Sequence, residues 1–384
     1  MLVYHVIELT NWTGFPKDGP LVWFRLGFMG VDLFFVISGF VITHMAIAVY
    51  GQSRSSFWAT FMVNRLCRIV PLYLLTLIVF TVLVIPSILQ HPHFLRHALM
   101  HLGFVHNFTY DTQGSINGPN WTIATEMQFY VCLAAILPWL IRIRPLYLIG
   151  ICVAIAWLFR FTMFHIVDDG SLRTFHLFVL TTQLPGCFDL FGFGIALALV
   201  MRTKRYETIS STRWFWPSCA FATIAAITMT LKLFWIFPEY WSDPVAVTLF
   251  PTLLAVSSCL TVLLACQIKS TTALRILSPL QYLGTISYGI YLWHLTIIMI
   301  LKGSQSATPF EVLLSTLAGT FFLSSLSWHL LEAPIVSIGK ALSLGIRLGR
   351  IRNPVDDVHK LSPSPHYTAD RSDRAQYTGE GTFG

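Results

Sequence analysis

Residues 28–50 read FMGVDLFFVISGFVITHMAIAVY, a run in which Asp32 is the one charged side chain. A helix rises about 1.5 Å per residue, so about 20 apolar residues are needed to cross the hydrocarbon core of a bilayer, which is about 30 Å thick. This run is long enough and apolar enough to do so. It therefore predicts a transmembrane helix.

Similar runs follow along the chain, and together they predict a membrane-embedded helix bundle. The segment 1–10 is apolar but short, and the weaker segment 93–106 favours a helix at the membrane interface. We therefore expect an all-α, polytopic bundle of about ten transmembrane helices, the first of them short or truncated. The further predicted spans are 70–90, 123–141, 145–165, 174–201, 214–237, 244–266, 280–301 and 310–332.

The composition excludes several other classes of protein. Of 384 residues, 55% are apolar and 11% are charged, whereas soluble domains carry about 25% charged residues. The mean hydropathy is +0.65. The net charge of +7 is therefore interpreted as a signal of membrane topology, with lipid as the partner, and no nucleic-acid partner is expected.

The distribution of basic residues predicts the orientation of the bundle, because cytoplasmic connections of membrane proteins are enriched in lysine and arginine. Two alternating sets of connections differ in this respect, and the richer set is predicted to be cytoplasmic together with both termini. The richer set holds Arg54, Arg65, Arg68, Arg142, Arg144, Arg202, Lys204, Arg205, Arg213, Lys269 and Arg275. The poorer set holds Lys17, Arg25, Arg96, Arg160, Arg173 and Lys302.

The two ends of the chain differ in character from its middle. We predict a membrane domain over 1–334, a basic interfacial segment over 335–352 and a disordered cytoplasmic tail over 353–384, where Pro, Ser, Asp and Gly predominate. The segment 1–10 would rise only about 15 Å as a helix, and no positively charged region precedes it. We therefore expect that the true start lies upstream.

Ionisable residues inside apolar spans are costly and mark function by default. Glu126, in NWTIATEMQFY over 120–130, is the sharpest candidate, because a carboxylate this far into an apolar helix must face a cavity or a partner. His5 alone is more typical of a packing residue. Asp32 is compatible with a helix-start role, since an anion is favoured there. His294, in the run YLWH, is equally compatible with packing and function.

Arg65 and Arg68 are three positions apart and so share one face of a helix. They are compatible with two roles: anchoring to anionic lipid, or clamping a phosphate, which guanidinium groups bind in a forked geometry. The histidines of 91–106 lack a carboxylate or cysteine that would complete a metal-ligand set. We expect no metal site.

Six motifs follow one another along the chain: LVYH (2–5), GVDLFFVISGF (30–40), RLCRIVPLY (65–73), NWTIATEMQFY (120–130), SYGIYLWH (287–294) and EAP (332–334). In this order they resemble the acyltransferase 3 family, bacterial integral-membrane enzymes that O-acylate extracytoplasmic sugars. The resemblance covers about residues 1–340. The family places an arginine eleven positions before the first histidine, which here falls before Met1; Thr122 stands where serine is usual, and Ala333 replaces a basic residue.

The resemblance implies an O-acyltransferase of the bacterial inner membrane that takes an acyl group, commonly acetyl, from cytoplasmic acyl-CoA. It implies a carbohydrate acceptor: a surface glycan, a lipid-linked sugar or a lipochitin oligosaccharide. The implied site residues are His5, Glu126 and Asp32 for catalysis, Arg65, Arg68 and Tyr73 for the donor, and Trp121, Tyr130 and His294 for the acceptor.

Two mechanisms are compatible with this set of residues. In the first, His5, oriented by Glu126 or Asp32, removes the proton from a sugar hydroxyl, which attacks the thioester. In the second, an acyl-histidine forms as an intermediate. The alternative function is a secondary transporter, since intramembrane carboxylates and histidines also build proton relays; the inverted repeats typical of transporters are not visible here.

Overall fold

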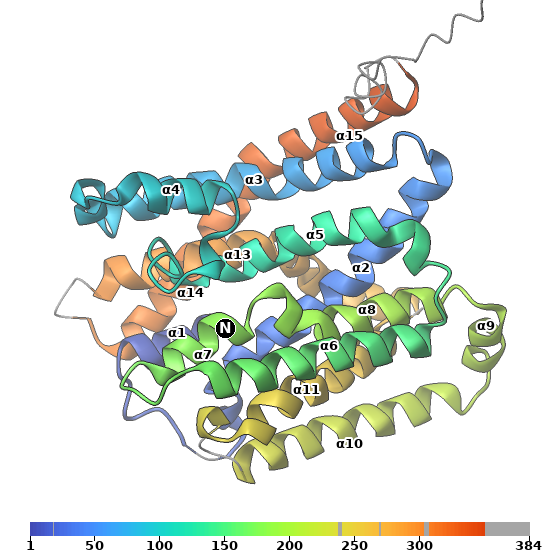
Figure 1. The fold of residues 1–384 in the computed structure, drawn as a ribbon, viewed down its shortest axis with the longest axis horizontal. Helices are drawn as coiled ribbons and strands as arrows, with labels where there is room; N and C mark the ends of the chain where they lie inside the picture. The colour runs from blue at the N-terminus through green and yellow to red at the C-terminus, as the bar shows by residue number, and fades with distance from the viewer. Residues whose placement is uncertain (18, 237–239, 269, 303–306, 350–384) are drawn as a thin grey trace, which may run out of the picture.

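The computed structural model describes residues 1–17, 19–236, 240–268, 270–302 and 307–349, and every regular element in these ranges is helical. The chain folds as a bundle of long helices (Figure 1). Eight described helices are long and apolar enough to span a membrane, and a ninth candidate is a bent pair. The prediction of an all-α, polytopic membrane bundle is confirmed. The principal helices are α2 (Gly30–Gln52), α3 (Phe57–Leu83), α5 (Trp121–Leu140), α6 (Pro145–Ile166), α10 (Phe215–Ile236), α11 (Pro244–Ala265), α13 (Ser278–Lys302) and α14 (Pro309–Ser327).

The bent pair occupies the predicted span 174–201. α7 (Arg173–Thr181) and α8 (Phe188–Val200) are separated by a 3₁₀ turn, Leu184–Cys187, and the two parts meet at an angle of 74°. Pro185 lies in this turn and cannot donate a backbone hydrogen bond. The next residue, Gly186, packs so tightly against the Thr181 carbonyl that a Cβ atom would lie 2.0 Å from its oxygen. The span is therefore broken where the cavity described below lies.

The structure moves two predicted boundaries. α3 begins at Phe57, so Arg65 and Arg68 lie inside this helix and not in the connection that precedes the predicted span 70–90. α14 continues through a π-helical turn, Trp328–Glu332, into α15 (Ala333–Arg347), which lies against α3 (Figure 1). The predicted interfacial position of 335–352 stays a prediction, and the tail 353–384 lies outside the described residues.

Short helices cap the two ends of the bundle. α1 (Leu2–Leu9), with eight residues, is too short to span a bilayer. α1, α4 (Phe94–Leu102) and α7 lie at one end, and α9 (Lys204–Ser210) lies at the other, beside the turn between α5 and α6 (Figure 1). The last described short helix is α12 (Thr271–Ile276). The lysine- and arginine-rich connections that hold α9 and the α5–α6 turn thus share one end.

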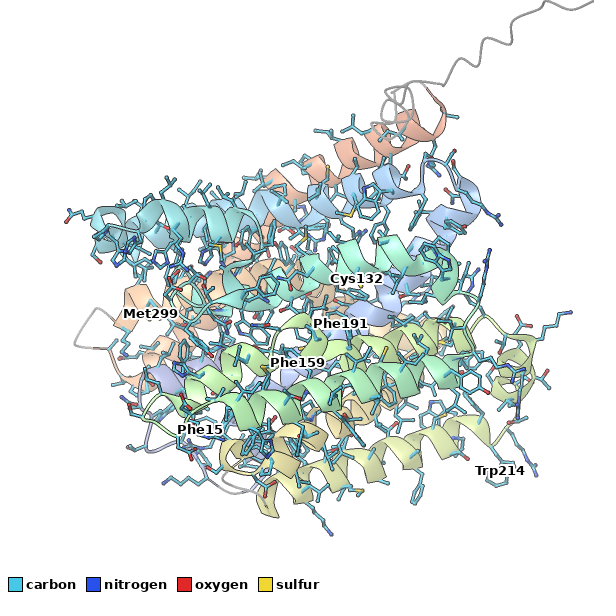
Figure 2. All side chains as sticks on the ribbon, viewed as in Figure 1. Phe15, Cys132, Phe159, Phe191, Trp214 and Met299 are labelled. Carbon is cyan, nitrogen blue, oxygen red and sulfur yellow. The ribbon has the colours of Figure 1, made fainter. Side chains whose placement is uncertain are left out.

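The interior is built by aromatic side chains on facing helices. Phe191 of α8 lies 4.8 Å from Phe35 and 4.1 Å from Phe129, ring centre to ring centre. Phe191 points into the bundle, whereas Trp214 projects from its end (Figure 2). Large apolar side chains such as Phe221 and Leu146 are exposed on the outside. Such a surface is stable in lipid, because lipid tails are as apolar as these side chains, so the chain is a multi-pass membrane protein.

The crossing between α2 and α8 depends on two glycines. A Cβ atom on Gly194 would lie 2.2 Å from the Val36 carbonyl oxygen, and one on Gly39 would lie 2.3 Å from that of Phe191. Because these neighbours are backbone atoms, no side-chain rotation relieves the clash. Small residues of this kind let membrane helices approach closely.

Gly194→Ala is therefore expected to force the two helices apart, at a cost of about 1–3 kcal/mol, and to lower the thermal unfolding temperature in detergent. Gly150→Ala in α6 is the matched control, because a Cβ atom there meets nothing within 4 Å. It should be neutral or stabilising by up to about 1 kcal/mol, since alanine favours helices over glycine. Equal unfolding temperatures for the two variants would contradict this packing.

Candidate active site

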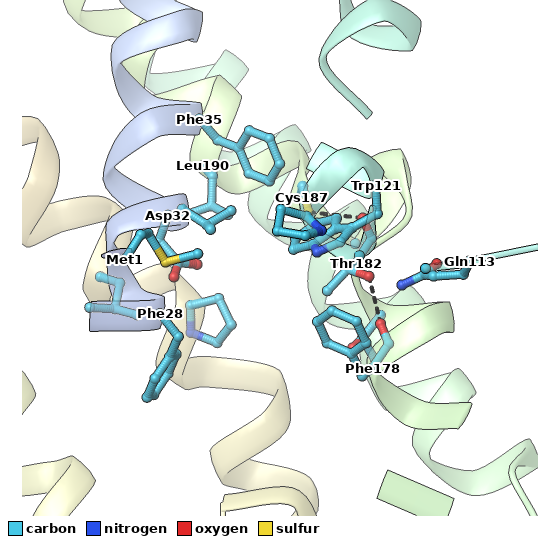
Figure 3. Close-up of a pocket in the computed structure, with 18 of the residues that line it drawn as sticks. Met1, Phe28, Asp32, Phe35, Gln113, Trp121, Phe178, Thr182, Cys187 and Leu190 are labelled. Atoms are coloured by element: carbon cyan, nitrogen blue, oxygen red, sulfur yellow. Dashed lines mark hydrogen bonds between the residues drawn. The ribbon is translucent and has the colours of Figure 1, made fainter. Parts of the chain in front are cut away.

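A cavity of about 460 Å³ lies at the bend between α7 and α8 (Figure 3). Its volume is in the range of small-molecule sites, about 300–1,000 Å³. The wall is mostly aromatic and apolar, and it includes the side chains His5, Asp32 and Gln113. The aromatic lining residues are Tyr4, Phe28, Phe35, Trp121, Phe175, Phe178, Tyr240, Trp241, Phe250 and Tyr291.

α1 places His5 in this wall, next to His294 of α13. The two imidazole rings lie 5.1 Å apart, centre to centre. The Nδ1–H of His294 donates to the Tyr291 carbonyl oxygen at 2.5 Å, which leaves its Nε2 as a hydrogen-bond acceptor. The Nε2 atoms of both histidines are buried without a partner among the described residues. The structure thus brings together the first and fifth family motifs.

The protonation state of His5 follows from its surroundings. Burial lowers the pKa of the His5 imidazole to about 4, because a charged ring is disfavoured away from water. The ring is therefore neutral at neutral pH. A neutral imidazole is the form that accepts a proton.

Asp32 of α2 lines the same cavity as His5, and its carboxylate is visible at the cavity edge in Figure 3. Arg160 of α6 also lines the cavity, and it forms a two-pronged ion pair with Asp189 of α8, which lies behind the wall, at 3.0 and 2.5 Å. Arg160 also donates to the backbone carbonyls of Gly186 and Thr248. The Arg160 guanidinium is therefore held by protein partners, and it buttresses the bend between α7 and α8.

Glu126 is not among the described residues that line this cavity. Its Oε1 accepts hydrogen bonds from Ser38 at 2.7 Å and from Tyr130 at 2.6 Å. Arg65 lies over the Tyr130 ring, with its Cζ atom 6.0 Å from the ring centre. The structure therefore groups Glu126 and Tyr130 with Arg65, whereas Asp32 is the carboxylate that shares a cavity with His5.

The two arginines of α3 have different surroundings. Arg68 forms an ion pair with the buried Glu332 of the π turn and lies between two aromatic rings, those of Tyr288 and Trp328. In the described part of the chain, no carboxylate pairs with Arg65; its guanidinium contacts only the Met45 sulfur at 3.8 Å, besides the ring already mentioned. Arg65 is thus the one that retains free donors for an anionic ligand.

Tyr73 and Trp121 complete the predicted set. Tyr73 is buried in α3, and its hydroxyl donates to the backbone carbonyl of His101 in α4 at 3.1 Å, so it fastens α4 to α3. Trp121, the first residue of α5, lines the cavity opposite Asp32 (Figure 3).

Within the described ranges, no group of three or more His, Cys, Asp or Glu residues is placed to hold a metal ion.

Sequence reasoning missed two residues of this region. The distribution of basic residues places Arg160 in a connection, but it is 1% exposed inside α6. Asp189, a carboxylate within an apolar segment, is the one sequence signal of its buried partner. Gln113 lies in the polar connection between α4 and α5, where a glutamine is unremarkable. Its proximity to the cavity is a property of the fold alone.

A family profile described as "Acyltransferase domain" matches residues 1–329. The chain belongs to the acyltransferase 3 family. No solved structure matches it significantly.

Three curated relatives are named as O-acetyltransferases, the first two of them for peptidoglycan. Peptidoglycan O-acetyltransferase OatA of Listeria monocytogenes is 28% identical over 82% of this chain and 52% of the relative. The putative peptidoglycan O-acetyltransferase YrhL of Bacillus subtilis is 29% identical over 86% of this chain and 54% of the relative. O-acetyltransferase OatA of Staphylococcus aureus is 25% identical over 82% of this chain and 53% of the relative. The chain therefore spans about half the length of these relatives.

Removing one half of the Arg160–Asp189 pair should destabilise the bundle by about 3–5 kcal/mol, because the remaining charge is left buried. Arg160→Met should lower the thermal unfolding temperature markedly, and Arg160→Met combined with Asp189→Leu should recover part of the loss. The control is Arg96→Met, since the Arg96–Asp111 pair is about half exposed and such pairs contribute at most about 1 kcal/mol. If the loss of stability in the double variant equals the sum of the losses in the two single variants, the two side chains do not form a coupled pair.

Proposed function

We propose that this protein is an integral-membrane O-acyltransferase, which moves an acetyl group from acyl-CoA on the cytoplasmic side to a hydroxyl of a surface glycan outside. The single observation that carries the proposal is the pair of imidazoles His5 and His294, whose Nε2 atoms have no partner among the described residues, with His5 in the wall of a mostly apolar and aromatic cavity. Membership of the acyltransferase 3 family supports it.

In the proposed mechanism His5 is the general base. Its neutral Nε2 takes the proton of the acceptor hydroxyl as the oxygen attacks the thioester carbonyl carbon. The new C–O bond forms, the C–S bond breaks, and the leaving thiolate receives the proton from the imidazolium. Asp32, in the same cavity, would stabilise that transient positive charge. An acyl-His5 intermediate remains the second version of this chemistry.

We propose that the donor approaches along α3. Arg65 offers an unpaired guanidinium, and guanidinium groups bind phosphate oxygens in a forked geometry. Arg68, held by Glu332, would contribute charge from a fixed position. Tyr73, bonded to α4, would then act by holding α3 in place and not by touching the donor.

The acceptor side of the proposal follows from the cavity wall. Gln113, Gly114, Gly118 and Pro119 of the α4–α5 connection line the cavity. This connection lies at the opposite end of the bundle from α9 and the α5–α6 turn (Figure 1). If those basic connections are cytoplasmic, the cavity is reached from outside. Peptidoglycan, the acceptor in two relatives' names, is the surface glycan that we propose; nothing favours a lipid-linked sugar or a lipochitin oligosaccharide over it.

His5→Ala should abolish transfer of labelled acetyl from acetyl-CoA to a glycan acceptor by the purified protein in detergent, because the base is removed. His165→Ala is the control: His165 is exposed on α6, and its ring contacts the Phe161 carbonyl of its own helix. The control should retain wild-type activity. Full activity of the folded His5→Ala protein would overturn the proposed mechanism.

Arg65→Gln should raise the KM for acetyl-CoA about tenfold or more, since a charge-assisted contact to phosphate is lost, with less effect on the acceptor KM. Arg54→Gln, an exposed arginine in the α2–α3 connection, is the control and should leave both constants unchanged. An unchanged donor KM for Arg65→Gln would place the acyl-CoA phosphates elsewhere.

A further inference from the structure

Gln113 is a buried polar side chain that the protein leaves unsatisfied. It is 5% exposed, and neither its Nε2 nor its Oε1 has a hydrogen-bond partner in the part of the chain that the structure describes. Leaving buried donors and acceptors unpaired destabilises a protein, so a native structure that does so usually has a reason. In Figure 3 the Gln113 amide points into the cavity, toward Thr182 and Phe178.

The connection that carries Gln113 is built to hold it in this position. The Gln113 backbone N–H donates to the Thr109 carbonyl at 3.0 Å, and the Thr112 hydroxyl donates to the His106 carbonyl at 2.7 Å. The next residue, Gly114, has a φ of +73°, a left-handed conformation that favours glycine. The backbone that carries the amide is therefore held in place before any ligand arrives, which lowers the entropic cost of binding.

The charged side chains of the cavity wall disfavour an anionic ligand. Asp32 is the carboxylate that lines the cavity, and Arg160, the guanidinium there, already donates to Asp189 and to two backbone carbonyls. His5 is a neutral imidazole. Among the described lining residues no cationic side chain is left unpaired to neutralise a carboxylate or phosphate. Aromatic faces such as Trp121 and Phe178 suit the apolar C–H face of a sugar ring, and a few placed polar groups then fix its orientation.

We propose that Gln113 is a specificity-determining residue of the acceptor site, whose amide hydrogen-bonds an oxygen substituent of an uncharged sugar unit held against the aromatic wall. This inference rests on the proposed function, because it assigns the cavity to the glycan acceptor. Gln113 binds and orients the sugar, and His5 at the same wall removes the proton. The class of acceptor that fits is a neutral pyranoside bearing hydroxyl or amide groups.

The test compares Gln113→Met with wild type, using purified protein, acetyl-CoA as the donor and the pentamer of N-acetylglucosamine as the acceptor. Methionine has a similar shape but no amide. The acceptor KM should rise about tenfold, the equivalent of one lost hydrogen bond, while the KM for acetyl-CoA stays unchanged. Because the Gln113 amide has no protein partner, the unfolding temperature should stay the same or rise.

Gln128→Met is the matched control. The Gln128 amide donates to the Phe104 carbonyl and to Asn107 Oδ1, both at 2.8 Å, so this variant should lower the unfolding temperature and leave the acceptor KM unchanged. The Gln113 variant should thus bind the acceptor more weakly without losing stability, whereas the Gln128 variant should lose stability without weaker binding. If Gln113→Met instead lowers the unfolding temperature and leaves the acceptor KM unchanged, Gln113 has a structural role and the inference is overturned.

The outcomes separate this inference from the proposed function. If wild type transfers acetyl to the pentamer but Gln113→Met has an unchanged acceptor KM, the inference fails and the proposed function stands. If wild type transfers acetyl to peptidoglycan strands but not to the neutral pentamer, the inference fails alone; if wild type transfers acetyl to neither, both fail. An oligomer of galacturonic acid provides the charge test: transfer to this anionic acceptor as efficient as to the neutral pentamer would overturn the proposed restriction to uncharged sugars.

Discussion

The constraint on which this structure depends is the cost of placing polar groups where there is no water. In a membrane bundle every ionisable side chain must find a partner or face a cavity. Arg160 and Asp189 satisfy each other inside the bundle, and Glu126 is satisfied by Ser38 and Tyr130. These pairs hold helices that are distant in sequence. Against that background, unpaired polar groups that also line a cavity, such as those of His5 and Gln113, point to a ligand.

Two regions carry the polar groups that the proposed function uses. His5 and Gln113 line the cavity at the α7–α8 bend, with His294 beside His5, and Arg65 lies on α3 over the ring of Tyr130. A π-helical turn carries Glu332, the partner of Arg68, and π turns occur often at functional sites. A reaction between a donor on one side of the membrane and an acceptor on the other requires two such regions within one bundle.

The sequence predicted the spans well, because length and hydropathy alone decide whether a helix can cross a bilayer. It did not predict the features that depend on contacts between residues distant in sequence. Arg160 was interpreted as a loop residue, since its partner Asp189 is 29 positions away. The sequence does not predict the bend at Pro185 and Gly186, because the segment 174–201 is apolar enough overall to be taken as one span despite the polar residues 181–183. Gln113 gave no signal, as polar residues are ordinary in connections. Family motifs identified His5 and His294, but only the structure brings the two rings together.

The central claim is that this protein esterifies a surface glycan. It is tested most directly by mass spectrometry of surface glycans from cells with and without the gene, before and after mild base. The account predicts an acetyl mass increment that base removes and that disappears with the gene. Identical glycans in the two strains would contradict it and would favour a transporter without acyl-transfer chemistry.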